Sequence, residues 1–393
     1  MHRIYLDNSA TTKICDEALE EYIRVSRECY GNPSSLHAMG FEAEKEISRA
    51  KEIISGTVGA KGATVVFTAS GSEANNLAIT GRALAKERYK KGGKIITTKG
   101  EHASVTSPVY KLRDAGFNVV EIPTVNGELD MTALMSELTP NVILVTMMMV
   151  NNETGAYYDL GAVSKLMRAR CPEAVLHADA TQSYLKIPFT KASVGADMIT
   201  LSSHKIEGPK GVGALIVDEK IIKTKGLSPM ILGGGQEGGL RSGTENVPGI
   251  AGFAKASEIG YRELKSRSEK TKELRGYLLE SLAEHPELNE IKAVTPIRHA
   301  PHILNLTLPG IKSETMLHHL SAMGIYVSSG SACSSNGGGA HHSSTALLSF
   351  GKTEAEADSS IRVSFSFRNE RSDVDALIEG LVLGVTKLQR VKK

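Results

Sequence analysis

The sequence lacks the features that would place it in a membrane, in a secretory pathway or among disulfide-stabilised proteins. Its longest apolar run, residues 142–150, is far below the length that spans a bilayer, and we interpret it as a central buried strand. Residues 2–7 are too short and too polar for a signal peptide. The cysteines are Cys15, Cys29, Cys171 and Cys333. They form no CxxC pair and have no metal-ligand spacing, which favours a cytoplasmic, reducing environment.

The sequence also lacks an excess of charge of either sign. Its 46 basic and 44 acidic residues give a net charge of +2, so no overall field attracts nucleic acid or a membrane surface. With 393 residues, 41% of them hydrophobic, the chain can bury a large core, and we expect two domains. The adjacent histidines His318-His319 and His341-His342 have no spaced partner, so they do not indicate a metal site.

Strand-like and helical segments alternate through the first half of the chain. The expected strands are 64–68, 94–98, 118–122, 142–150, 174–180, 196–201 and 213–217. Helices are expected between most of them, for example at 73–90 and 159–170, the second of which has a one-sided apolar stripe. This alternation predicts an α/β fold with a mostly parallel, seven-stranded sheet covered on both faces. In such sheets ligands bind at the carboxyl ends of the strands.

The pattern changes after residue 243. A long helical passage is expected at 247–282. It is followed by an α+β region with strands at 303–308, 326–329 and 362–367, helix 313–323 and a closing amphipathic helix. We therefore expect a large domain at 13–255 and a smaller domain formed by 1–12 and 256–393.

A lysine follows the expected strand 196–201 almost directly. Lys205 stands in the run Ser-Ser-His-Lys, and an amine at the exit of a buried strand is costly unless a neighbour neutralises or uses it. Buried lysines are also where amine pKa values fall and Schiff bases form. We interpret Lys205 as the lysine that holds pyridoxal phosphate as an imine.

The segment 68–76 has the composition of a phosphate-binding turn between a strand and a helix. Ser70 and Glu73 have capping-box spacing, and Gly71 allows a ligand to approach the backbone closely. Free N–H groups and the helix dipole favour an anion here, and the Ser72 hydroxyl can add a donor. An ordinary capped helix start gives the same pattern. The segment is neither a Walker loop nor GxGxxG, which argues against a nucleotide.

Three more polar side chains lie at or after the ends of expected strands and suit the ring of the same cofactor. Asp179 ends the strand 174–180, and a carboxylate there would keep the ring nitrogen protonated, although an aspartate at a strand end can equally cap a helix. Gln182 suits a hydrogen bond to the phenolic oxygen of the ring. His102 follows 94–98 and could stack on the ring and move protons, although a lone histidine is more often structural.

Several motifs, together with the stretch 5–12, resemble one known family. They are 150–155 (VNNETG), 177–183 (HADATQS), 202–205 (SSHK), 240–244 (LRSGT) and 328–334 (SSGSACS). Over nearly the whole chain the sequence resembles the group I cysteine desulfurases of the NifS/IscS type. These belong to the fold-type I, class V aminotransferase-like enzymes that depend on pyridoxal phosphate.

The resemblance implies a role for each matching residue. Lys205 would bind the cofactor covalently, with His102 stacked on the ring. Asp179 would pair with the ring nitrogen, and Gln182 and Asn152 would bond oxygens beside the ring. The phosphate would be held by Gly71, Ser72, Ser202, His204 and, from the neighbouring subunit of a homodimer, Thr244.

The resemblance also implies the substrate and the reaction. Arg362 would bind the carboxylate of L-cysteine, for which a planar bidentate donor is well matched. Cys333 would take the sulfur as a persulfide, leaving L-alanine, and its Ser/Gly-rich surroundings would let it travel to an acceptor. The acceptor would be an iron–sulfur scaffold or a tRNA- or cofactor-thiolation enzyme. By itself, Arg362 would be read as part of an ion pair.

Two positions depart from the family pattern, and two other functions remain open. Gly238 stands where a basic residue is common, and Glu207 stands where an aromatic or similar residue is usual. The first alternative is a selenocysteine lyase or another β-eliminating enzyme on the same fold, against which Cys333 in its flexible loop argues. The second is a non-catalytic sulfur-relay partner, against which the intact Lys205, Asp179 and His102 argue.

Overall fold

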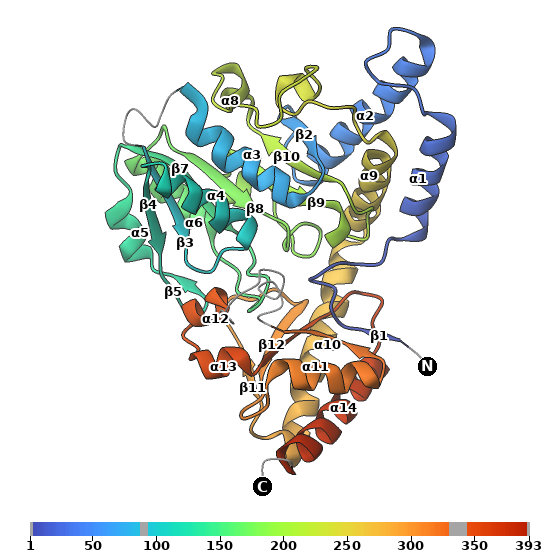
Figure 1. The fold of residues 1–393 in the computed structure, drawn as a ribbon, viewed down its shortest axis with the longest axis vertical. Helices are drawn as coiled ribbons and strands as arrows, with labels where there is room; N and C mark the ends of the chain where they lie inside the picture. Colours follow the sequence, from blue (N-terminus) through green and yellow to red (C-terminus); the bar gives the residue numbers. More distant parts are fainter. Residues whose placement is uncertain (1–2, 87–92, 330–343, 391–393) are drawn as a thin grey trace.

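The computed structural model describes residues 3–86, 93–329 and 344–390. The chain forms two layered units, one above the other in Figure 1, each built around its own sheet and apolar core. In this described part of the chain, no helix is long and apolar enough to cross a membrane.

The larger unit contains a seven-stranded sheet in the order β2-β10-β9-β8-β7-β3-β4. Only β10 is antiparallel to its neighbours, and the other adjacent pairs are parallel, so the predicted fold class is confirmed. The strands are β2 Thr64–Thr68, β3 Lys94–Thr98, β4 Asn118–Ile122, β7 Val142–Met148, β8 Val175–Asp179, β9 Met198–Ser202 and β10 Gly213–Val217.

Helices cover both faces of this sheet because alternate strand residues are apolar on both sides. On β2, Val66 packs with helices α3 and α4, whereas Val65 and Phe67 pack in the core of α1, α2 and α9 (Figure 1). These helices are α1 Asp16–Glu28, α2 Ala38–Thr57, α3 Gly71–Leu84, α4 Ala103–Asp114 and α9 Val247–Arg262. Helices α5 Met131–Glu137, α6 Leu160–Arg170, α7 Lys191–Val194 and α8 Glu219–Lys223 complete the unit.

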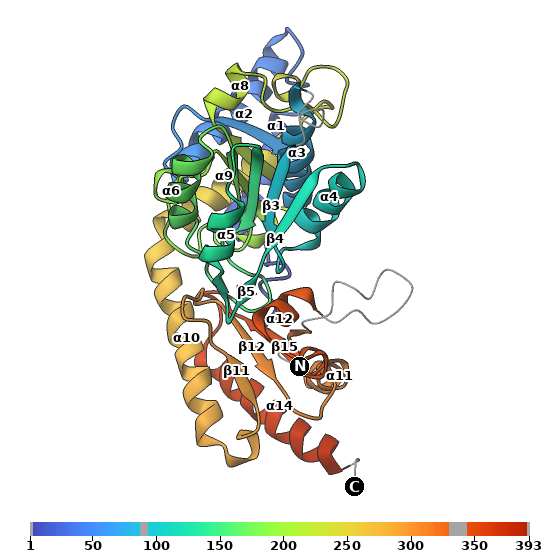
Figure 2. The ribbon, with the colours of Figure 1, turned by 90° about the vertical axis from the view of Figure 1, so that its left-hand side faces the viewer.

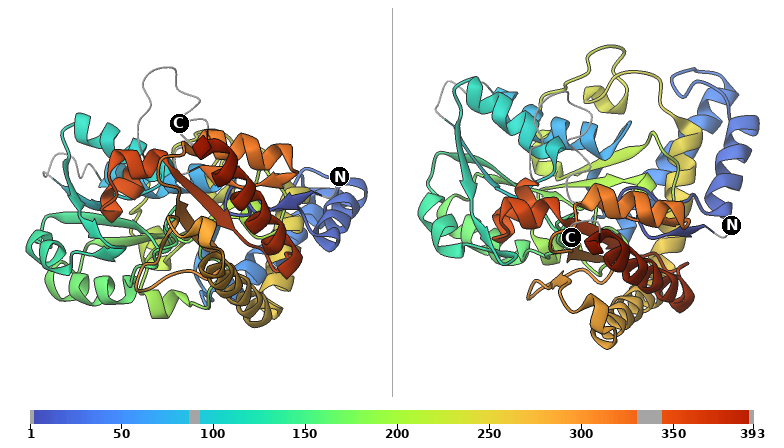
Figure 3. Two further views of the ribbon diagram at one scale, coloured as in Figure 1. Left: turned by 90° about the horizontal axis from the view of Figure 1, so that it is seen from below. Right: turned by 60° about the horizontal axis from the view of Figure 1, so that its bottom comes forward.

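The smaller unit contains an antiparallel four-stranded sheet in the order β11-β12-β15-β14. Its strands are β11 Lys292–Val294, β12 Ile303–Thr307, β14 Ser328–Ser329 and β15 Ser360–Ser364. Its helices are α10 Leu264–Glu284, α11 Ser313–Ala322, α12 Thr345–Phe350, α13 Glu354–Asp358 and α14 Arg371–Arg390. Seen from below in Figure 3, α14 packs against α10 and α11.

The N-terminal strand belongs spatially to the end of the chain. Strand β1, Ile4–Tyr5, pairs in parallel with β13, Ile325–Tyr326, and Asp7 forms a bridge with Ser364. The following residues enter the larger unit, where the backbone N–H of Thr12 donates to the carbonyl of His204 at 2.9 Å. Residues 5–12 therefore connect the two units.

The expected helical passage 247–282 is in fact two helices, α9 and α10, which meet at Glu263. The break coincides with a change of packing partner. Ala256 and Ile259 pack in the core of the larger unit, whereas α10 enters the smaller core from Leu274 onward. Figure 2 shows α10 running down from the larger unit along the smaller one. The division after residue 255 stays a prediction, and this packing favours a slightly later one.

The packing of α9 leads to a first prediction. Phe253 is completely buried and its ring meets that of Tyr184 edge to face, with centroids 6.4 Å apart. Phe253→Ala is expected to lower the free energy of unfolding by about 3–5 kcal/mol through lost burial and a cavity, as measured by urea denaturation. Ile297→Ala, at a side chain 73% exposed, should change it by less than about 0.5 kcal/mol. Equal losses in both variants would contradict this account.

Candidate active site

The polar side chains that follow three parallel strands of the large sheet line one cavity of about 470 Å³. His102 follows β3, Asp179 ends β8 and Lys205 follows β9, as expected for strands that run in the same direction. The smaller unit closes the other side of the cavity with Arg362 of β15 and Ser328 of β14. The cavity therefore lies where the two units meet.

Lys205 ends a short turn, Ser203–Lys205, that leaves β9. Its amine is half-buried, and Nζ donates hydrogen bonds to the carbonyls of Ser9 at 2.5 Å and Ala10 at 2.8 Å. The imidazole of the preceding His204 is held by Thr11, with Nδ1 3.1 Å from the hydroxyl. Burial and the neighbouring lysines lower the pKa of His204 to about 4, so its ring is neutral near pH 7.

Asp179 is buried at the end of β8, and both of its carboxylate oxygens accept a hydrogen bond. The side-chain amide of Asn75 on α3 donates to Oδ2 at 2.8 Å, and the backbone N–H of Thr181 donates to Oδ1 at 2.9 Å. Asn75 also donates to the hydroxyl of Ser104 at 2.8 Å. The carboxylate is thus fixed in direction and linked to the start of α4.

His102 is the N-cap of α4, and this position determines its tautomer. The backbone N–H of Ser104 donates to Nδ1 at 3.1 Å, and the Ser104 hydroxyl lies 2.9 Å from the same nitrogen. Because Nδ1 is an acceptor, the neutral ring carries its proton on Nε2. Burial lowers the pKa of His102, so this neutral form predominates near pH 7. His102 therefore offers an N–H donor.

The turn before α3 has the geometry expected of an anion site. The Ser70 hydroxyl accepts from the N–H of Glu73 at 3.1 Å, and the Glu73 carboxylate accepts from the N–H of Ala69 at 2.9 Å. A Cβ on Gly71 would lie 3.2 Å from that of Ser202, so the turn and the end of β9 are in close contact. Gly71, Ser72, Ser202 and His204 all line the cavity.

Arg362 is buried where the two units meet, and two of its nitrogens are already bonded. Nη2 pairs with the carboxylate of Asp7 at 2.7 Å, and Nη1 donates to the backbone carbonyl of Asn152 at 2.9 Å. The remaining Nε has no hydrogen-bond partner among residues 3–86, 93–329 and 344–390. A guanidinium that is held in place and lines a cavity fits a carboxylate ligand.

Of the predicted site residues that the structure describes, only Thr244 does not line this cavity. Thr244 is exposed and lies with Glu237 and Arg241 beside a separate hollow of the same chain. Cys333 lies outside the described residues. Gln182 lines the cavity, but its amide is engaged, since Nε2 donates to Ser9 and Oε1 accepts from Lys186 at 3.3 Å.

Several ionisable side chains in or near the site were not predicted from the sequence. Asp7 holds Arg362, and its motif gave no hint of that partner. Burial raises the pKa of Glu101 to about 8 and that of Glu153 to about 7, and lowers the pKa of Lys186 to about 7. In the sequence, Glu101 follows the expected strand 94–98 and Glu153 lies in the motif 150–155, but no pattern marks Glu101, Glu153 or Lys186 as buried.

The groups around the cavity fit pyridoxal phosphate. A lysine, an anion-binding helix start and a buried carboxylate lie on one cavity, with a histidine donor beside them. Each matches one part of the cofactor: the aldehyde, the phosphate, the ring nitrogen and the ring face. The observation that decides the fit is the direction of Asp179, whose two bonded oxygens and burial hold it at the rim.

Comparison with known proteins agrees with this geometry. Residues 4–377 match the model of the class-V aminotransferase family. The chain belongs to that family, whose NifS-like members depend on pyridoxal phosphate. It is 36% identical over 380 residues to the cysteine desulfurase IscS 1 of Archaeoglobus fulgidus, covering 96% of this chain and 95% of that one. It therefore falls in the NifS/IscS group of cysteine desulfurases.

Solved structures give the same relationship. A NifS-like protein superposes with a TM-score of 0.89 at 32% identity, covering 98% of this chain and all of the other. A second structure, SspA in complex with cysteine, has a TM-score of 0.78 at 29% identity, covering 93% of this chain and 99% of the other.

The tight contact behind the phosphate turn gives a second prediction. A Cβ on Gly213 of β10 would lie 2.4 Å from the backbone carbon of Ser70, so Gly213→Ala must displace the turn. We expect the affinity for pyridoxal phosphate to fall by roughly tenfold or more, as measured by absorbance titration of the cofactor-free protein. Gly56→Ala, where the added Cβ meets nothing within 4 Å, should leave the affinity unchanged. Unaltered binding in Gly213→Ala would contradict the assignment.

The buried Glu101 gives a third prediction. Its carboxylate accepts from Thr98 and from the backbone N–H of Met148, yet burial raises its pKa from 4.5 to about 8. A raised pKa means that the folded state binds the proton more tightly, so stability falls as pH rises from about 4.5 through about 8. Glu101→Gln does not titrate.

The free energy of unfolding of wild type minus that of Glu101→Gln should therefore decrease over this pH range. Urea unfolding at pH 5, 6, 7 and 8 measures this difference. A difference that stays constant with pH, or that increases, would rule out a neutral buried carboxyl.

Proposed function

We propose that this protein is a cysteine desulfurase that releases L-alanine from L-cysteine and carries the sulfur as a persulfide on Cys333. The observation that carries this proposal is one cavity lined by Lys205, Asp179, His102 and Arg362. The relationship to named cysteine desulfurases, and to SspA in complex with cysteine, supports the same substrate.

The cofactor would be held by residues from three segments. The N-terminus of α3, with Gly71 and Ser72, and the end of β9 would bind the phosphate, and Asp179 would pair with the ring nitrogen. Bound pyridoxal phosphate supplies an electron sink for the substrate Cα. His102 would present its Nε2–H to the ring side of the cavity.

The chain's own groups would then handle the substrate. Arg362, whose guanidinium is held in place by Asp7, would bind the cysteine carboxylate. Lys205 or His102 would move the Cα proton. The Cys333 thiolate would bond to the substrate sulfur as the sulfur–carbon bond breaks.

The assembly and the acceptor belong to the same proposal. Thr244 is exposed and away from its own cavity, which supports a role across the interface of a homodimer. The acceptor would be an iron–sulfur scaffold or a tRNA- or cofactor-thiolation enzyme. We also propose a cytoplasmic location, as the cysteine pattern predicts.

The test is to incubate the cofactor-loaded protein with L-cysteine and to search by mass spectrometry for one added sulfur on Cys333. We expect that mass together with alanine release, and neither in Lys205→Ala. Alanine release that continues in Cys333→Ser with added thiol would instead favour a β-eliminating lyase. A protein that binds no cofactor would favour a non-catalytic relay partner.

A further inference from the structure

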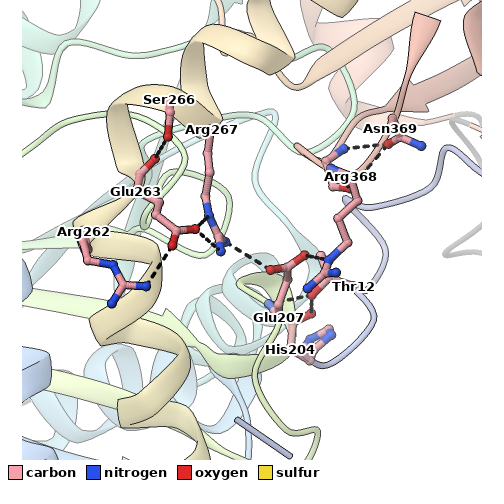
Figure 4. Close-up of polar contacts among 10 residues, drawn as sticks. Thr12, His204, Glu207, Arg262, Glu263, Ser266, Arg267, Arg368 and Asn369 are labelled. Carbon is pink, nitrogen blue, oxygen red and sulfur yellow. Dashed lines mark hydrogen bonds and ion pairs between the residues drawn. The ribbon is translucent and has the colours of Figure 1, made fainter. Parts of the chain in front are cut away.

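Glu207 lies two residues after Lys205 and pairs with two arginines of distant segments (Figure 4). Its Oε2 lies 3.1 Å from Nη1 of Arg267, and its Oε1 accepts from Nε of Arg368 at 2.8 Å. Only 5% of the Glu207 side chain is exposed, so both interactions are shielded from solvent on the carboxylate side. The role of this carboxylate is not explained by cofactor or substrate binding.

The two arginines lie on segments of the smaller unit. Arg267 lies in the first turn of α10, next to the break at Glu263, to which it also pairs at 3.0 Å. Its guanidinium stacks over the ring of Phe367 at 3.8 Å. Arg368 follows the same phenylalanine, four residues after the end of β15, the strand that carries Arg362. The Glu207 carboxylate thus joins the lysine turn, residues 203–207, to helix α10 and to the segment that follows β15.

The backbone of Glu207 is also held by Thr12, at the end of the connecting segment 5–12, and by Cys15. Its N–H donates to the Thr12 hydroxyl at 2.7 Å, and its carbonyl accepts from the N–H of Cys15 at 2.9 Å. The same Thr12 hydroxyl donates to the carbonyl of His204 at 2.9 Å, so Thr12 is hydrogen-bonded to the backbone on both sides of Lys205. Glu207 has φ of +65°, a left-handed conformation that a residue with a Cβ adopts only when its surroundings hold it there.

A buried ion pair is weak evidence for stability, because removing charges from water offsets much of their attraction. Its clearer consequence is to fix geometry, since the charges tolerate few alternative arrangements. Here the fixed geometry connects the amine of Lys205 to the guanidinium of Arg362, and both face the same cavity. Their separation decides whether a small amino acid can reach both.

We propose that Glu207 is a positioning residue, which sets the affinity for the substrate by fixing the smaller unit, and with it Arg362, relative to Lys205. This inference rests on the roles proposed above for Lys205 and Arg362. Glu207 itself is not among the residues that line the cavity. Because the cofactor groups lie on the larger unit, loss of the carboxylate should weaken substrate binding more than cofactor binding.

The test compares wild type with Glu207→Gln, each as the cofactor-loaded protein, because glutamine keeps the shape and removes the charge. We expect KM for L-cysteine to rise by roughly tenfold, with kcat within about twofold and the cofactor content and absorbance unchanged. Hydrogen exchange without substrate should become faster at 204–208 and 366–369 and stay the same at 71–76. Arg368→Gln, which removes one arm at a side chain 42% exposed, should raise KM in the same direction.

The matched control is Glu263→Gln, which removes another carboxylate partner of Arg267 without touching the lysine turn. It should leave KM and the exchange of 204–208 at their wild-type values. An unchanged KM in Glu207→Gln, an equal KM rise in Glu263→Gln, or loss of cofactor in step with KM would overturn the proposal. Wild type that releases no alanine would contradict the proposed function instead, while the exchange measurement still tests the coupling.

Discussion

The amine of Lys205 donates hydrogen bonds to the backbone carbonyls of Ser9 and Ala10, and this contact connects the two units of the molecule. The segment that provides the carbonyls starts in the smaller unit, where β1 pairs with β13, and ends at Thr12 on the lysine turn. A site that needs groups from both units keeps its geometry only if the relative position of the units is fixed, and this segment helps to fix it. The same segment supplies Asp7, which holds Arg362 on the opposite side of the cavity.

Burial controls the charges around this cavity. His102 and His204 have lowered pKa values and are neutral near pH 7, and Glu101 and Glu153 have raised pKa values because their charged forms lose contact with water. These neutral neighbours therefore add little charge around Lys205, Asp179 and Arg362, the groups assigned to the reaction. The tautomer of His102 follows from a simpler cause, because the helix start at Ser104 requires an acceptor at Nδ1.

Much of the fold follows from local pattern. The seven strands were expected within one or two residues of their observed bounds, because apolar, β-branched runs between turn residues are strong signals. The places of His102, Asp179 and Lys205 also follow, since parallel strands bring the residues after them to one edge. The break at Glu263 could not be predicted, because the helical pattern is continuous there and only the change of packing partner separates α9 from α10.

The sequence by itself determined the class of fold, the family and the chemical groups at the strand ends, because these depend on residue type and on spacing along the chain. Only the tertiary structure decided which distant groups meet: Asn75 with Asp179 inside the larger unit, and Asp7 with Arg362 and Glu207 with Arg267 and Arg368 where the two units meet. These partners lie from 60 to 355 residues apart in the chain. No local pattern encodes such a pair, since each contact exists only after distant segments of the chain have packed together.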